Sequence, residues 1–95
     1  MLFNFICKDA PNSKEAREKF KSAHRVRLTE LLKQNRLTLV GQLLDEETNS
    51  IVKGSLIVAE FDSLEQAQNW ADSDPYKERN VYKSVTIYPF NKVLP

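Results

Sequence analysis

The chain has 95 residues, a formal net charge of +1, 41% hydrophobic residues and 28% charged residues, values that are ordinary for one globular domain. A charge this close to neutral gives no argument for nucleic acid or an anionic membrane as a partner. We therefore expect a single domain over residues 1–95 that binds no nucleic acid.

The cellular location is predicted from the cysteine content and the N-terminus. A single cysteine, Cys7, excludes a disulfide within the chain and agrees with a reducing compartment. The first residues lack the basic start and the small-residue cleavage site of a signal peptide. No apolar run approaches the roughly eighteen residues that a membrane-spanning helix needs. We expect a cytoplasmic protein that does not associate with a membrane.

The first third of the chain predicts a strand followed by a long helix. Apolar and aromatic residues favour a strand over 2–8. Asn12, with Glu15 three residues later, is typical of a capping box at the start of a helix. The apolar spacing predicts that this helix runs from about 13 to 34, and Asn35 can close it in the left-handed conformation.

The middle of the chain predicts two strands. One is expected over 37–44, where Gly41 is a candidate bulge position. The polar segment 45–50 then connects it to a third strand over 54–61, which has the clearest strand pattern in the chain.

The last third predicts a helix and a final strand. Ser63, with Gln66 three residues later, marks the start of the helix, and Leu64 is expected on its core face. The last strand is expected over 81–88, ended by Pro89.

The resulting order is βαββαβ. With right-handed crossovers this order predicts an α+β fold: a ferredoxin-like plait, in which a four-stranded antiparallel sheet carries two helices on one face. The third strand is nevertheless apolar on both faces, with Leu56 and Val58 on one and Ile57, Ala59 and Phe61 on the other. A second subunit is the expected cover for the face that the helices leave open.

His24 is the only histidine in the chain. It lies four residues after Phe20 and four before Leu28, so it belongs to the apolar stripe of the first helix and points inward. One interpretation is a core histidine with a satisfied hydrogen bond. The other is a general acid or base, since imidazole titrates near working pH.

Asp74 is the natural partner of that histidine. The residue before a proline is kept out of the helical region, so Pro75 holds Asp74 on a stiff backbone. Asp74 can also be a simple turn residue. Tyr76 can line a pocket or pack in the core. Arg27 can pair with an anionic substrate or remain solvated.

The residue inventory excludes several chemistries. One histidine and one cysteine cannot form a His/Cys metal cluster, and two glycines cannot supply a Gly-rich phosphate loop. The central strands lack the basic, glycine-spaced aromatic signature of an RNA-binding plait. We expect neither a metal nor a cofactor.

The chain resembles the YciI-like (YCII-related) family of small bacterial proteins, which is related to the dimeric α/β-barrel proteins. The resemblance covers essentially the whole chain and is most specific in the second half, at Ala59–Phe61, Ser63–Glu65, Ala67–Gln68, Trp70–Asp72 and Asp74–Tyr76. Two features depart from the family pattern and would change the mouth of a pocket: the short acidic connection 45–53, and Gly41-Gln42 where Gly-Pro is usual.

The resemblance implies a plait that forms a homodimer through its sheet faces, as a dimeric α/β barrel. It implies an active site built from His24 and Asp74. From their positions in the sequence beside these two residues, Tyr76 and Arg27 are the candidate substrate-binding residues. Some family members are linked to dehydrochlorination of hydroxylated aromatics. Two hypotheses follow: a lyase- or isomerase-type enzyme acting on a small metabolite, or a non-catalytic ligand-binding or accessory dimer.

Overall fold

A computed structural model describes residues 1–95. Four strands and three helices follow one another along the chain, as the sequence order predicts except for one additional short helix. Their bounds are β1 Leu2–Asp9, α1 Lys14–Lys33, β2 Leu37–Leu44, β3 Val52–Glu60, α2 Leu64–Asp72, α3 Pro75–Glu78 and β4 Tyr82–Phe90.

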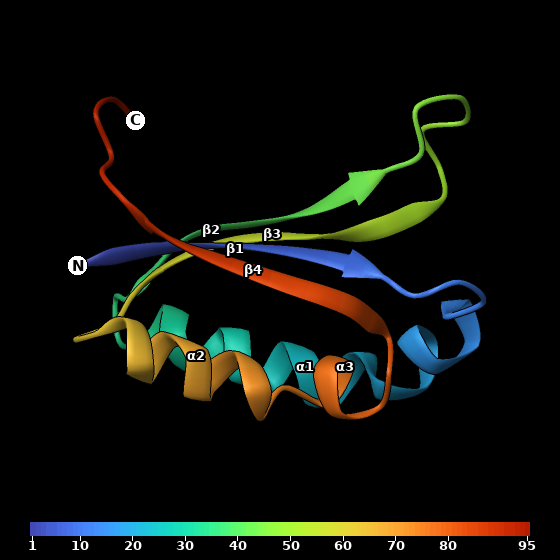
Figure 1. Cartoon of the computed structure of the whole chain (residues 1–95), viewed down its shortest axis with the longest axis horizontal. Helices are drawn as coiled ribbons and strands as arrows, with labels where there is room; N and C mark the ends of the chain where they lie inside the picture. Colours follow the sequence, from blue (N-terminus) through green and yellow to red (C-terminus); the bar gives the residue numbers. More distant parts are fainter.

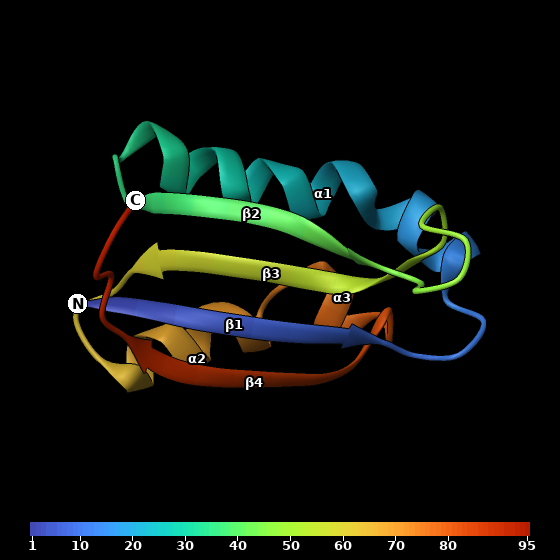
Figure 2. The ribbon, with the colours of Figure 1, turned by 90° about the horizontal axis from the view of Figure 1, so that it is seen from above.

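The strands form one antiparallel sheet in the order β2-β3-β1-β4 (Figure 2). All three helices lie on the same face of this sheet, and the opposite face carries none (Figure 1). The predicted α+β, ferredoxin-like plait is thereby confirmed. None of its helices is both long and apolar enough to cross a membrane.

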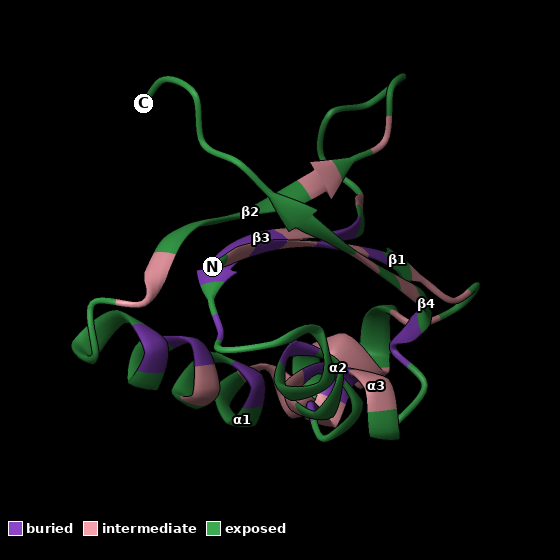
Figure 3. Cartoon of the chain, turned by 60° about the vertical axis from the view of Figure 1, so that its left-hand side comes forward, coloured by how far each residue is buried: buried purple, intermediate pink, exposed green.

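The hydrophobic core lies between the sheet and the helices. Phe5 is fully buried and makes edge-to-face contacts with Phe61 and Trp70, at centroid distances of 5.6 and 5.3 Å. Such contacts add to the burial of apolar area. Buried residues gather on the two central strands and on the helix sides that face them (Figure 3).

The strand register decides which residues face the helices. Phe5 pairs with Ile57 on the covered face, and both are buried. The neighbouring pair Ile6 and Leu56 therefore points to the face without helices, where both side chains are partly exposed. Both faces of the folded sheet therefore carry apolar side chains, as expected from the sequence.

The start of α1 differs from the prediction. Ser13, not Asn12, occupies the cap position, and its side chain makes no capping hydrogen bond. Asn12 has a φ of 59°, so it belongs to the turn before the helix. The capping-box prediction is wrong, because the left-handed turn residue precedes the cap. At the other end of α1, Asn35 has the predicted left-handed conformation, with a φ of 58°.

Three other local predictions are wrong. Gly41 pairs regularly with Leu56, and the irregularities of β2 lie at Leu37/Leu39 and Leu43/Leu44. Pro89 lies inside β4, which is tolerated because β4 is an edge strand and a missing N–H costs nothing on the side without a neighbour. Leu64, expected in the core, is 50% exposed because it lies in the first turn of α2.

Candidate active site

His24 projects from α1 toward the sheet and is only 5% exposed. Its Nδ1 atom lies 3.0 Å from each of the two carboxylate oxygens of Asp74. Its ring stacks on Tyr76, with centroids 4.0 Å apart and planes 10° from parallel. Contacts on these two sides fix the orientation of the imidazole.

The local sequence explains why Asp74 is held in place. Asp74 caps α3 from an extended conformation, with φ −68° and ψ 133°, and Pro75 occupies the first helical turn. The Oδ1 atom of Asp74 accepts a hydrogen bond of 2.9 Å from the backbone N–H of Tyr76. The sequence Asp-Pro-Tyr, predicted as a turn, is thus a capped four-residue helix that presents its carboxylate to α1.

Arg27 contacts the same carboxylate from another side. Its Nη1 atom is 3.4 Å from Oδ2 of Asp74, and its Nη2 atom donates to the carbonyl of Trp70 at 2.8 Å and to the hydroxyl of Ser73 at 3.0 Å. The guanidinium also lies over the Trp70 ring, 4.7 Å from its centroid. Arg27 therefore ties α1 to α2 and to Asp74, and it does not line the cavity described next.

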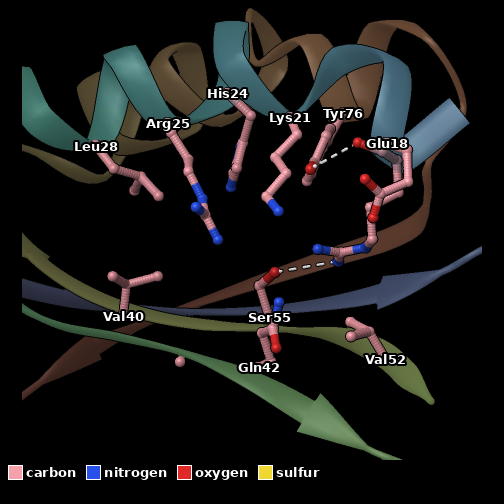
Figure 4. A pocket seen from close by; sticks show the side chains of 12 residues that line it. Glu18, Lys21, His24, Arg25, Leu28, Val40, Gln42, Val52, Ser55 and Tyr76 are labelled. Carbon is pink, nitrogen blue, oxygen red and sulfur yellow. Dashed lines mark hydrogen bonds between the residues drawn. The ribbon is translucent and has the colours of Figure 1, made fainter. Parts of the chain in front are cut away.

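A cavity of about 240 Å³ lies between α1 and the strands β2 and β3, beside His24 (Figure 4). This volume is below the roughly 300–1,000 Å³ of pockets for drug-sized ligands, so the cavity suits a small molecule. The lining residues are Arg17, Glu18, Lys21, His24, Arg25, Leu28, Val40, Gly41, Gln42, Val52, Ser55 and Tyr76. Gly41 and Gln42 are thus part of the cavity wall.

The second ring nitrogen of His24 has no partner in the chain. Nε2 makes no hydrogen bond and is not among the buried atoms that lack one. An ionised Asp74 beside Nδ1 favours the tautomer with the proton on Nδ1, an assignment made from the hydrogen-bond network. The Nε2 lone pair is then free, on a residue that lines the cavity. This arrangement can accept and return a proton.

Tyr76 is positioned by its hydroxyl. The phenol donates to the backbone carbonyl of Arg17 at 3.0 Å, and burial raises its pKa above the ordinary value. The hydroxyl is therefore already engaged, and the ring is what Tyr76 presents beside His24. The sequence indicated both a pocket wall and core packing for Tyr76, and its 1% exposure fits packing against the imidazole.

A second cavity, of about 490 Å³, adjoins the first at Arg17, Glu18 and Val52. It lies between the β1–α1 connection and residues 50–53. Asp9 at its edge accepts two hydrogen bonds of 2.9 Å from the Arg17 guanidinium. This bidentate pair fixes Arg17 between the two cavities.

Sequence reasoning missed several residues of the cavity wall. Lys21 was not singled out, although its position four residues after Arg17 and four before Arg25 puts all three on one face of α1. That spacing was the available signal. Ser55 gave no such signal, because only the pairing of β3 with β1 and β2 brings it beneath α1. The structure contains no group of three or more His, Cys, Asp or Glu side chains that could hold a metal ion.

A four-stranded plait with its helices on one face, and a His–Asp contact beside a small cavity, define an α+β domain with an acid–base candidate site. The chain belongs to the YCII-related domain family, whose sequence profile matches residues 1–91.

Individual relatives agree with that assignment. The chain is 39% identical to Protein YciI of Escherichia coli O6:H1, over 99% of this chain and 100% of that protein. It is 37% identical to an uncharacterized protein of Haemophilus influenzae, over the same shares of the two chains. Its fold matches 5-chloro-2-hydroxyhydroquinone dehydrochlorinase (TftG) from Burkholderia phenoliruptrix, solved in complex with 2,5-dihydroxybenzoquinone. That match has a TM-score of 0.86 and 22% identity, over 96% of this chain and 94% of the other.

Proposed function

We propose that this protein is a proton-transfer enzyme of the lyase or isomerase type that acts on a small polar or aromatic metabolite. His24 is the acid–base residue, and Asp74 positions its ring. The observation that carries the proposal is the pairing of Nδ1 with the Asp74 carboxylate at 3.0 Å, which leaves Nε2 without a partner on a cavity-lining residue.

The proposed step begins when Nε2 of His24 takes a proton from the substrate. In a lyase reaction the C–H electron pair forms a new double bond, and the leaving group departs with its own bonding pair. In an isomerase reaction the same pair forms an enolate, and His24 returns the proton to another atom. Asp74 keeps the ring oriented and stabilises the imidazolium that forms.

The structural neighbour supports the class of reaction. TftG is a dehydrochlorinase, and removal of HCl is a lyase step that needs a proton acceptor. Because that protein shares only the fold with this chain, its substrate is a starting point for assays. Arg27, a candidate for substrate contact from the sequence, acts in this proposal through Asp74, its nearest charged partner.

The proposal includes a homodimer formed through the sheet face without helices. That face carries exposed apolar side chains, among them Leu39 at 46%, Tyr88 at 54% and Phe90 at 37%. The Oδ1 atom of Asn4 on the same face is buried without a hydrogen-bond partner. A second copy would cover the apolar side chains and offer polar partners to Asn4.

Two assays test the enzymatic proposal. The first measures chloride release from 5-chloro-2-hydroxyhydroquinone. The second measures deuterium uptake from D₂O by a panel of small carbonyl and hydroxyaromatic compounds. With a compound that the protein turns over, His24→Ala should lower the rate about a hundredfold or more. Asp74→Asn should also impair it, while Asp62→Asn, at an exposed aspartate, should not. A wild-type rate in His24→Ala would contradict the proposal.

The burial of the site favours a second candidate function, a non-catalytic ligand-binding or accessory dimer. Asp74 is only 2% exposed and also caps α3, so the pair can serve the fold alone. In that case His24→Ala would lower stability, and no compound of the panel would react faster with the wild-type protein than with the variant.

A further inference from the structure

Two cations enter the cavity without a partner. Lys21 and Arg25 both point from α1 into the space above the sheet (Figure 4), and neither forms an ion pair. The third cation, Arg17, is already paired with Asp9. Glu18, which is exposed, is the one carboxylate among the lining residues. The cavity lining therefore carries more positive than negative charge, and no ion pair within the chain engages Lys21 or Arg25, of which Arg25 is exposed.

Ser55 supplies a hydrogen-bond donor to the same cavity. It is 3% exposed, and its Oγ accepts from the Tyr82 hydroxyl at 2.9 Å and from Arg17 at 3.4 Å. Burial raises the pKa of Tyr82, which keeps that phenol protonated as the donor. A serine hydroxyl that accepts twice still has its own hydrogen to donate. With the Tyr82 hydroxyl as donor to Ser55, no further hydrogen bond engages the Ser55 hydroxyl within the chain, and the residue lines the cavity.

We infer that this cavity binds a small organic oxyanion, such as a carboxylate, phenolate or enolate, between the Lys21 and Arg25 head groups and the Ser55 hydroxyl. The apolar side chains of Leu28, Val40 and Val52 would contact its carbon skeleton. The inference rests on the proposed proton transfer at His24, because it names the ligand class of the same cavity. It also deepens that proposal. When Nε2 removes a proton, negative charge develops on a substrate oxygen, and Lys21, Arg25 and Ser55 would stabilise that charge.

Pairs of charged and neutral probes of similar shape test the inference: benzoate with benzamide, and acetate with acetamide. NMR of the full-length protein would follow the backbone amides of lining residues and the His24 ring. The anions should produce saturable shifts at Lys21, Gln42 and Ser55, and the neutral amides should bind about tenfold more weakly or not at all. Anion affinity should fall as the salt concentration rises.

Variants assign the binding to named side chains. Lys21→Gln and Arg25→Gln should each weaken benzoate binding about fivefold, after discounting a charge-assisted hydrogen bond because Lys21 is partly exposed and Arg25 is exposed. Lys33→Gln, at the far end of α1 and outside the cavity lining, is the matched control and should bind as wild type. Ser55→Ala should weaken binding about threefold. If that variant is poorly folded, the lysine and arginine variants still decide the question.

His24→Asn separates this inference from the proposed function. Anion binding should survive that change, because the cations and Ser55 carry it. Loss of activity in His24→Asn with benzoate binding retained would support both the enzyme and the oxyanion site. Benzoate binding by a wild-type protein that turns over no compound of the panel would support the oxyanion site and count against the enzyme. The inference is overturned if benzamide binds as tightly as benzoate, if Lys21→Gln and Arg25→Gln bind like Lys33→Gln, or if neither anion produces a saturable shift at the lining residues.

Discussion

Nδ1 of His24 lies 3.0 Å from both carboxylate oxygens of Asp74, although 50 residues separate the two in the chain. Each partner is held by its own element: His24 lies in the middle of the long helix α1, and Asp74 caps α3. The contact therefore joins the two parts of the helical layer, and its loss should affect both the candidate site and the fold.

Asp74→Ala should lower the free energy of unfolding by about 3 kcal/mol. The change removes the cap of α3 and leaves the partly exposed Arg27 guanidinium and the buried His24 ring without their shared acceptor. Urea denaturation followed by circular dichroism measures the loss. Asp72→Ala, which removes an exposed pair with Lys77, is the control and should change stability little. Equal losses in the two variants would contradict a structural role for the buried contact.

The two glycines should respond oppositely to alanine. A Cβ atom at Gly54 would collide with the backbone carbonyl of Cys7, so Gly54→Ala must push β1 and β3 apart. We expect a loss of about 2 kcal/mol or more. A Cβ atom at Gly41 meets nothing within 4 Å, and Gly41→Ala should be neutral or slightly stabilising. The same denaturation experiment compares them, and a well-tolerated Gly54→Ala would show that β1 and β3 are less closely paired.

Cys7 should be unreactive in the folded protein. Burial raises the pKa of its thiol to about 12, so roughly one molecule in ten thousand carries the reactive thiolate at a pH near 8. Ellman's reagent should label Cys7 only after denaturation in guanidinium. Val26→Cys, at a residue 60% exposed on α1, places a second thiol in solvent and should react at once. Rapid labelling of Cys7 in the native protein would mean that the covered sheet face opens readily.

The proposed dimer should break when a charge is placed on the sheet face without helices. Leu39 is 46% exposed in the single chain, so Leu39→Lys should leave the fold intact but prevent the face from being covered by a second copy. Light scattering should give about twice the 11.0 kDa chain mass for the wild type and about that single mass for the variant.

Val26→Lys introduces the same charge at a comparably exposed apolar residue on the helical layer, and it should remain a dimer. A wild-type protein that is monomeric at micromolar concentration would remove the dimer from the proposal. A dimer that tolerates lysine at position 39 would place the interface elsewhere.

The elements were predictable wherever local chemistry decides the conformation. The apolar periods of the strands and of α1 fixed their positions to within about two residues, and the Ser63 hydroxyl accepts the predicted hydrogen bond from Gln66 N–H. Two predictions, for Pro89 and Gly41, failed because a neighbouring element decides the outcome. Pro89 remains in a strand because β4 lies at the edge of the sheet, and Gly41 pairs regularly because β3 holds it in register.

The sequence by itself determined the family, the plait, the inward position of His24 and the rigid backbone around Asp74, because each depends on local spacing, proline geometry or a motif. Only the tertiary structure decided that Arg27 contacts Asp74 while Arg25 enters the cavity, although both are charged neighbours of His24 on one helix. It alone brought Ser55 beneath Lys21. The physical reason is that a side chain's partners depend on the packing of α1 against a sheet assembled from distant segments, and no local pattern records that packing.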